Sequence, residues 1–266
     1  MRTVWVIGIG AGDPEHLTLQ AIAAMNRVDV FFTIDKGEQK SDLAGLRAEL
    51  LARHVTRPHR VVEATDPPRD RALHNAAADY ASIVAQWQAR RGEVYARMIT
   101  DELPDGGVGG FLVWGDPALY DGTLRLVGEI AEQVPLEVVS VPGISSVQVL
   151  AARHRLILNR IGRPFLVTTG RRLSDGGFPA DVDDVVVLLD GREAFAELQD
   201  PDVDIYWGAY LGTPDELLVA GDLQQVKAQI QAARAEARER KGWIMDTYLL
   251  RRRGVIGSRP QDLAGS

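Results

Sequence analysis

The sequence predicts an α/β protein of two domains, with a doubly wound, mostly parallel sheet in the first and a mixed sheet in the second. Up to residue 153, short apolar segments alternate strictly with segments of helical periodicity, which is typical of parallel strands joined by helices. After residue 164, several apolar segments follow one another without a helix between them, which predicts antiparallel pairing. We therefore expect an N-terminal domain over 1–118 and a C-terminal domain over 119–266.

In the first half, each element is predicted from a local pattern. Thr18 can cap a helix whose apolar residues recur at helical spacing, and the run at 29–34 is almost wholly apolar, as in a strand buried on both faces. Pro67 and Pro68 predict a loop before a long helix. These patterns predict strands over 4–9, 29–34, 60–64, 111–114 and 136–141, and helices over 18–27, 41–53, 71–91, 122–131 and 146–153.

The second half is richer in strands. Asp222 is placed to cap a long helix with one apolar face, and a turn at 212–215 separates two apolar segments. The patterns predict strands over 165–169, 184–189, 204–207, 217–220 and 243–250, and a helix over 223–240.

The composition excludes several classes of protein. The chain has 266 residues, 45% of them apolar, and a net charge of −7, which gives no overall attraction for nucleic acid or an anionic membrane. Because cysteine is absent, disulfides and thiolate metal sites are excluded, and we expect no metal site. No apolar run approaches the roughly 20 residues of a membrane span, and no signal segment precedes the first strand. We expect a cytoplasmic protein.

The first strand leads into a loop with three glycines, Gly8, Gly10 and Gly12. Missing side chains let a ligand lie against backbone amides, although tight packing of a strand-to-helix turn is the ordinary alternative. A dinucleotide site needs a small residue at the last position of G-x-G-x-x-G, where this chain has Asp13. That carboxylate would face a pyrophosphate, and no G-x-x-x-x-G-K-[ST] occurs, so NAD and a P-loop nucleotide are both disfavoured.

Two further loops, at 115–120 and 142–146, also follow predicted strands. Each has an ordinary alternative, which is an Asp-Pro turn for the first and serine helix caps for the second. Three such loops exceed what those alternatives explain, because ligands of open α/β sheets bind at the carboxyl ends of the strands. Their glycines, hydroxyls and carboxylates favour a ligand with a cationic, hydrogen-bonding end over a polyphosphate.

Together, the three loops resemble those of the tetrapyrrole (corrin and porphyrin) methyltransferase family. The segments are GIGAGDPEHLTL, WGDPALYDG and VPGISS, and the likeness extends over almost the whole chain. It implies two α/β domains with a cleft for S-adenosylmethionine between them, and a homodimer. The segments FFTIDKG, TTGRRL, VLLDGREAF, YWGAYLGTPDE and IMDTYLLRR most resemble a member that methylates a precorrin and releases acetate in aerobic cobalamin synthesis.

The family pattern also implies which residues bind the methyl donor. Carried over position by position, they are Gly10, Ala11, Trp114, Gly115, Asp116, Leu119, Tyr120, Ser145, Ser146, Leu189 and Asp190. This chain departs from the pattern at Ala11, where the family has proline, and at 189–191, where Leu-Asp-Gly stands in place of Tyr-Met-Gly. The second departure puts a carboxylate where the family often has a thioether, so either the donor is held differently or Asp190 has another role.

Methyl transfer from a sulfonium requires alignment of the reacting carbon and exclusion of water, without a nucleophilic side chain. Release of an acetyl group as acetate implies attack by water on a carbonyl, which benefits from a general base and a donor to the developing oxyanion. The candidates are Asp35, Tyr120, Asp190 and Tyr210. Each has a structural alternative, such as an aromatic at the edge of the core for the two tyrosines.

A precorrin bears many carboxylates, so arginines are expected at the substrate, and we expect Arg171 and Asp13 to contact it. The run at 251–253 is three arginines, which ordinarily would be solvated. Two alternatives are kept. One is a methyltransferase of the same fold acting on a different precorrin, on ribosomal RNA or on a protein, and the acidic composition speaks against RNA. The other is a nucleotide-binding oxidoreductase.

Overall fold

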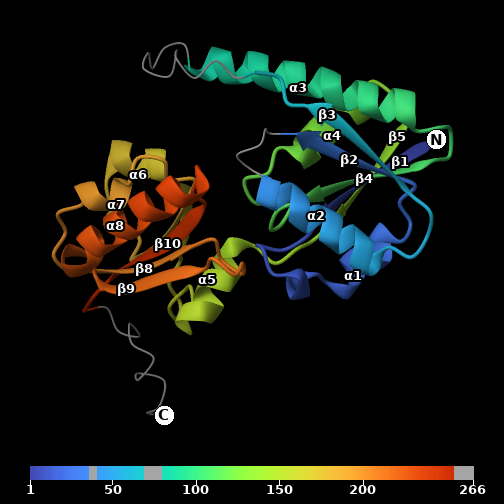
Figure 1. Cartoon of the computed structure of the whole chain (residues 1–266). Helices are drawn as coiled ribbons and strands as arrows, with labels where there is room; N and C mark the ends of the chain where they lie inside the picture. The colour runs from blue at the N-terminus through green and yellow to red at the C-terminus, as the bar shows by residue number, and fades with distance from the viewer. Residues whose placement is uncertain (36–40, 69–79, 255–266) are drawn as a thin grey trace. The chain divides into compact units, whose positions relative to one another are not determined.

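The computed structural model describes residues 1–35, 41–68 and 80–254, and it divides into two compact units, each with its own five-stranded sheet (Figure 1). Unit 1 comprises Met1–Gly10 and Pro14–Ile144, and unit 2 comprises Ala11–Asp13 and the chain from Ser145 onward. One sheet is wholly parallel and the other is mixed, so the predicted fold class is confirmed.

The sheet of unit 1 has the strand order β3-β2-β4-β1-β5. Consecutive strands are joined by helices, as the alternation of patterns predicts. In chain order, the elements are β1 Arg2–Gly8, η1 Pro14–His16, α1 Leu19–Met25, β2 Val30–Asp35, α2 Ser41–His54, β3 Arg60–Thr65, α3 Tyr80–Glu102, β4 Val108–Val113, α4 Thr123–Ala131 and β5 Leu136–Val141.

The division between the units lies at Ile144 and Ser145, and not at 118 and 119 as the sequence led us to expect. The reason is the pairing of β5, which aligns with β1 from Arg2 opposite Leu136 to Ile7 opposite Val141. This pairing keeps α4 and β5 in unit 1, because a strand belongs to the sheet in which its partner lies.

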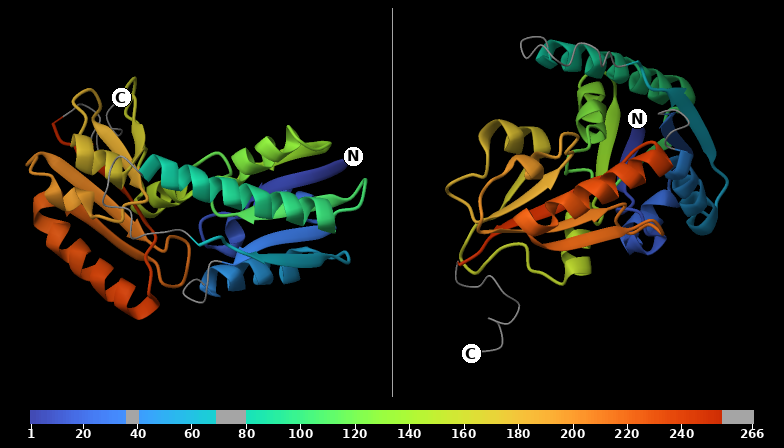
Figure 2. Two further views of the ribbon diagram at one scale, coloured as in Figure 1. Left: turned by 90° about the horizontal axis from the view of Figure 1, so that it is seen from above. Right: turned by 60° about the vertical axis from the view of Figure 1, so that its left-hand side comes forward.

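Alternate side chains of the unit 1 strands pack on opposite faces of the sheet. Val4, Val6 and Phe32 join a buried cluster with α3 and α4, whereas Ile7 and Phe31 join a second cluster with α1 and α2. Figures 1 and 2 show these two pairs of helices on opposite faces. Burial on both faces explains why these strands are nearly continuous apolar runs.

The strand β4 begins at Val108, three residues earlier than predicted, and includes Gly109 and Gly110. A Cβ on Gly109 would lie 2.6 Å from the ring of Phe32 and 2.8 Å from Leu103, and one on Gly110 would lie 2.8 Å from Val28. These glycines therefore make room for neighbouring side chains, and Gly109 and Gly110 belong to the strand, before the predicted start at 111.

The sheet of unit 2 has the strand order β6-β7-β10-β8-β9. Only β6 and β7 are parallel, whereas β7 with β10, β10 with β8 and β8 with β9 are antiparallel. In chain order, the elements are α5 Ser146–His154, β6 Leu166–Thr169, α6 Gly170–Gly176, β7 Asp184–Leu188, α7 Ala194–Glu197, β8 Val203–Ala209, β9 Leu217–Asp222, α8 Leu223–Lys241 and β10 Asp246–Arg252.

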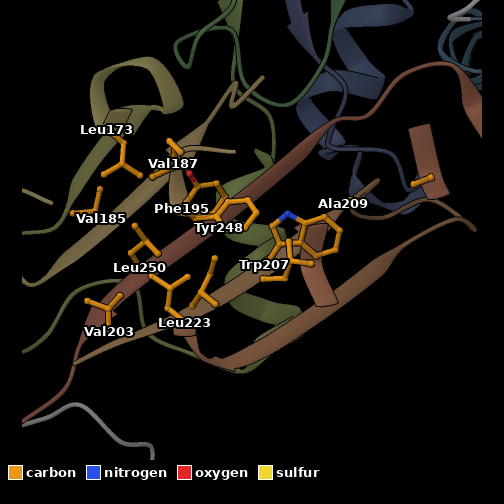
Figure 3. Close-up of a cluster of buried hydrophobic side chains, with 14 of the residues drawn as sticks. Leu173, Val185, Val187, Phe195, Val203, Trp207, Ala209, Leu223, Tyr248 and Leu250 are labelled. Atoms are coloured by element: carbon orange, nitrogen blue, oxygen red, sulfur yellow. The ribbon is translucent and has the colours of Figure 1, made fainter. Parts of the chain in front are cut away.

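The core of unit 2 lies between one face of this sheet and the helices α6, α7 and α8 (Figure 3). Its largest fully buried side chains include Trp207, Tyr210, Tyr248 and Phe195. The rings of Phe195 and Tyr248 meet edge to face with centroids 5.4 Å apart. Three of these aromatics carry a polar atom that must find a partner inside the core.

Some helices differ from prediction. The expected helix at 71–91 falls in part outside the described residues, and the observed α3 continues to Glu102. The short helices α6 and α7 were not predicted, because each is too short to show helical periodicity. Within the described ranges, no helix is long and apolar enough to cross a membrane.

The packing around β4 predicts that Gly109→Ala destabilises the protein by about 1 to 3 kcal/mol, because the new methyl group overpacks the contact with Phe32 and Leu103. Urea unfolding measures the change. Gly128→Ala is the control, because no neighbouring element of the described fold lies within 4 Å of the added methyl carbon in α4, and it should be neutral or stabilising by up to about 1 kcal/mol. Equal midpoints for the two variants would contradict the prediction.

Candidate functional site

The loops that follow β1, β4 and β5 meet through their backbones in unit 1. A Cβ on Gly8 would lie 2.7 Å from both the carbonyl oxygen of Gly115 and the amide nitrogen of Gly143, and a Cβ on Gly143 would collide with that same carbonyl oxygen. The Gly115 amide donates to the carbonyl oxygen of Gly10 at 2.8 Å. No side chain fits between them, so the backbones of the three loops pack directly against one another.

Asp116 ties two of these loops together. One carboxylate oxygen, Oδ2, accepts from the amide of Gly143 at 2.9 Å, and the other, Oδ1, accepts from the amide of Ala118 at 2.8 Å. The acidic residue predicted to bind the donor therefore also fixes the loop on which it lies. Its role at a ligand stays a prediction.

Three other predicted donor-binding residues lie on the same loop after β4. The indole Nε1 of Trp114 is buried, and the described part of the chain offers it no hydrogen-bond partner. Leu119 is half-buried, and Tyr120 is 47% exposed with a φ of 54°. Burial raises the pKa of Tyr120, so at neutral pH its hydroxyl is protonated and suits a hydrogen-bond donor better than a base.

In unit 2, the carboxylate of Asp190 is engaged inside the fold. The side chain is 4% exposed and accepts from the amides of Arg192 and Ala194 and from the hydroxyl of Tyr248, at 3.0, 2.8 and 2.6 Å. Burial, with the adjacent carboxylate of Asp190, raises the pKa of Tyr248 well above its ordinary value, so the hydroxyl remains a donor. The preceding Leu189 is 66% exposed and left-handed, with a φ of 55°.

A buried ion pair extends this network. Arg234 pairs with Asp246, which also accepts from the indole nitrogen of Trp207 at 2.8 Å. Arg234 further donates to the backbone carbonyl of Asp190 at 2.9 Å. Sequence reasoning missed the roles of Arg234, Asp246 and Tyr248, because the contacts of Arg234 and Tyr248 with Asp190 join residues 44 and 58 positions apart in the chain.

The two predicted serines begin α5. Ser145 is 4% exposed, caps the helix by accepting from the amide of Val147, and lies 2.5 Å from Gln148 Oε1 in a capping box. Ser146 Oγ lies 2.9 Å from Thr247 Oγ1. The hydroxyl of Ser145 is thus committed to the helix, whereas that of Ser146 is half-buried beside another hydroxyl.

The remaining candidates are dispersed. Tyr210 is 1% exposed and donates its hydroxyl to the carbonyl of Trp243 at 2.5 Å, which supports a packing role and no catalytic one. Asp35 ends β2, but its side chain lies outside the described residues. Ala11 and Asp13 flank Gly12, which packs against Thr213 and Leu211 within unit 2.

The arginine candidates differ in their surroundings. Arg171 lies half-buried in the first turn of α6. Arg251 is 6% exposed and pairs with Asp184, and Arg253 pairs with Asp222 at 2.7 Å. The expectation that the run at 251–253 is solvated is wrong for Arg251, whose ion pair and carbonyl contacts hold it in the fold.

Comparison with known proteins places these features in context. Residues 3–227 match the family described as Tetrapyrrole (Corrin/Porphyrin) Methylases. The chain is 46% identical over 255 residues to a precorrin-6A synthase [deacetylating] of Sinorhizobium sp, covering 95% of this chain and 96% of that one.

Solved structures agree with this match. A cobalamin synthesis related protein (CobF) from Corynebacterium diphtheriae aligns with a TM-score of 0.79 and 38% identity, over 95% of this chain and 99% of that one. A uroporphyrin-III C-methyl transferase from Thermus thermophilus, complexed with S-adenyl homocysteine, aligns at 0.53 with 22% identity over 93% and 96% of the two chains, which shows a likeness of fold.

The bonds of Asp190 predict that Asp190→Asn lowers the free energy of unfolding by about 1 to 3 kcal/mol, because the amide nitrogen of asparagine cannot accept from the buried groups that the lost oxygen serves. Chemical denaturation measures this loss. Asp181→Asn, at an exposed position of the same unit, should leave stability unchanged. Stability of the Asp190 variant equal to wild type would show that these bonds contribute little.

Proposed function

The chain belongs to the tetrapyrrole (corrin/porphyrin) methylase family, and on this basis we propose that it is an S-adenosylmethionine-dependent C-methyltransferase of cobalamin biosynthesis. It methylates ring carbon 1 of precorrin-5 and releases acetate, giving precorrin-6A. The observation that carries this proposal is the 46% identity, over 95% of the chain, to a precorrin-6A synthase [deacetylating].

The loops of unit 1 fit the proposed methyl donor. S-adenosylmethionine supplies an electrophilic methyl group when bound, and it presents an ammonium, ribose hydroxyls and an adenine to the protein. The glycine loops bring their backbones together at the carboxyl ends of β1, β4 and β5, where ligands of open α/β sheets bind. The buried Trp114 Nε1 is a hydrogen-bond donor that a ligand acceptor can satisfy. We therefore retain Gly10, Gly115 and Asp116 as donor-binding residues.

The reaction makes limited demands on side chains. Water adds to the acetyl carbonyl, the bond from that carbon to ring carbon 1 breaks, and its electron pair stays with the macrocycle, where it forms the new bond to the methyl carbon. The chain must therefore hold a water, donate to the acetyl oxygen and accept a proton. Of the four catalytic candidates, we favour Tyr120 as the hydrogen-bond donor to the acetyl oxygen. Its side chain is exposed on the loop after β4, and its hydroxyl is protonated.

Of the other three candidates, two are poorly suited to act as the base. The hydroxyl of Tyr210 and the carboxylate of Asp190 are engaged inside unit 2, so neither is available as a base without breaking a buried bond. Asp35, at the carboxyl end of a parallel strand, keeps its place as a proposed base. The homodimer and the cytoplasmic location expected from the sequence stay predictions.

The proposal predicts that purified protein, supplied with S-adenosylmethionine and precorrin-5, forms S-adenosylhomocysteine, acetate and precorrin-6A in equal amounts. Mass spectrometry follows the corrinoid, and enzymatic assay follows acetate. Heat-inactivated protein is the control. Formation of neither S-adenosylhomocysteine nor a methylated corrinoid would refute the proposed function, and methylation without acetate would refute the deacetylating step.

The packing of the glycine loops predicts that Gly143→Ala weakens binding of S-adenosylhomocysteine by at least about tenfold, because the added methyl group displaces the Gly115 backbone. Calorimetry measures the dissociation constant, and circular dichroism establishes that the variant is folded. Gly122→Ala, where no atom of the described residues crowds the added carbon within 4 Å, is the matched control. A folded Gly143 variant with wild-type affinity would contradict the assignment of this loop.

A further inference from the structure

Arg47, on α2, is a half-buried arginine that contacts the end of a central strand. Its Nε donates to the backbone carbonyl of Leu112 at 3.1 Å. Leu112 is the last but one residue of β4, and the loop that carries Gly115 and Asp116 begins two residues later. The guanidinium therefore lies at the carboxyl end of a parallel strand, where ligands of open α/β sheets bind.

The geometry of the sheet explains why an arginine reaches this carbonyl. The ladder between β2 and β4 pairs Val30 with Gly109 and ends at Phe32 opposite Phe111, so Leu112 is the first β4 residue beyond it. The two strands separate there, and the Nε of Arg47 satisfies a backbone acceptor that β2 no longer covers. This contact uses one of the five N–H groups of the guanidinium.

The surroundings of Arg47 differ from those of the buried arginines of the chain. Arg160, Arg234 and Arg251 are 2 to 6% exposed, and each pairs with a buried aspartate. Arg91, in the same unit as Arg47, pairs with Asp66 at 3.0 Å and also donates to the hydroxyl of Tyr95. Among the side chains that the structure describes, which do not include that of Asp35, no carboxylate lies within ion-pair distance of Arg47.

The surroundings of Arg47 disfavour its positive charge. Burial lowers its pKa, and Tyr95 and Asp121 oppose that shift from beyond contact distance. An arginine stays protonated in proteins, so the charge remains. Tyr95 is held in place by stacking on Phe111, with ring centroids 4.8 Å apart, and Asp121 accepts from the amide of Thr123 at 2.7 Å. Burial raises the pKa of Tyr95, so its hydroxyl is neutral and is no counter-ion, and Asp121 would lose its bond to the Thr123 amide if it moved onto the guanidinium.

We propose that Arg47 binds a carboxylate of the tetrapyrrole substrate. A precorrin carries several acetate and propionate groups, and a guanidinium forms short, charge-assisted bonds to a carboxylate. The substrate thus supplies an anion to a guanidinium that has none among the described side chains. This inference rests on the proposed function, and it differs from the sequence-based expectation, which named Arg171.

Kinetics with precorrin-5 test the inference. Arg47→Met should raise the KM for precorrin-5 by about 10- to 100-fold, the range expected for loss of a charge-assisted hydrogen bond, and should change kcat by much less. Arg47→Lys should fall between Met and wild type, because it keeps the charge and loses the planar fork. Arg53→Met, in the exposed last turn of α2, is the matched control and should behave as wild type.

Two further measurements separate the alternatives. Calorimetry with S-adenosylhomocysteine should give the same dissociation constant for wild type and Arg47→Met, and a loss confined to this affinity would show that Arg47 binds the carboxylate of the donor instead. Thermal unfolding reports a purely structural role, and a lowered midpoint with unchanged KM would overturn the inference. An inactive wild type refutes the proposed function itself, whereas an active wild type with unaffected Arg47 variants refutes only this site.

Discussion

The close approach of three backbones in unit 1 is the constraint on which the candidate site depends. Gly8, Gly115 and Gly143 are far apart in sequence, and they meet because β1 lies between β4 and β5 in the sheet. Only parallel pairing on both sides of β1 brings the three carboxyl ends to one edge. A Cβ on Gly8 or Gly143 would meet a carbonyl oxygen or an amide nitrogen of another loop, and Gly115 has a left-handed φ of 65°, which favours glycine.

The core of unit 2 depends on hydrogen bonds between buried polar groups. Its central side chains include Trp207 and Tyr248, whose polar atoms lie inside an otherwise apolar core (Figure 3). Asp246 accepts from Trp207, and Asp190 accepts from Tyr248. Arg234 links the two aspartates, because it pairs with the carboxylate of Asp246 and donates to the backbone carbonyl of Asp190. The carboxylate of Asp190 therefore serves as a buried hydrogen-bond acceptor within unit 2. These bonds give a physical reason for an aspartate where the family often has a thioether.

Features that depend on local periodicity could be predicted from the sequence, and features that depend on partners could not. The alternation of strands and helices indicated the parallel sheet, and the glycine clusters indicated the three loops. The place of β5 could not be predicted, because its pairing with β1 joins segments about 130 residues apart. The place of Gly109 within a strand could not be predicted either, because the side chains that occupy the space of its missing Cβ, those of Phe32 and Leu103, lie outside β4.

The same limit applies to charges, and Arg47 is the clearest case. At helical spacing, the residues three and four positions from Arg47 include the leucines at 43, 50 and 51, so the pattern places Arg47 on an apolar face without showing what it contacts. Arg251 belongs to a charged run and looks solvated. In the fold Arg251 is buried and Arg47 is half-buried, and their partners differ: Arg251 pairs with a buried aspartate, and Arg47 donates to a backbone carbonyl. Removing a charge from water costs desolvation free energy, which a paired anion offsets. A guanidinium without an anion beside it therefore lowers the stability of the fold until a ligand supplies one. A loss of stability of this kind is expected at residues that bind a ligand.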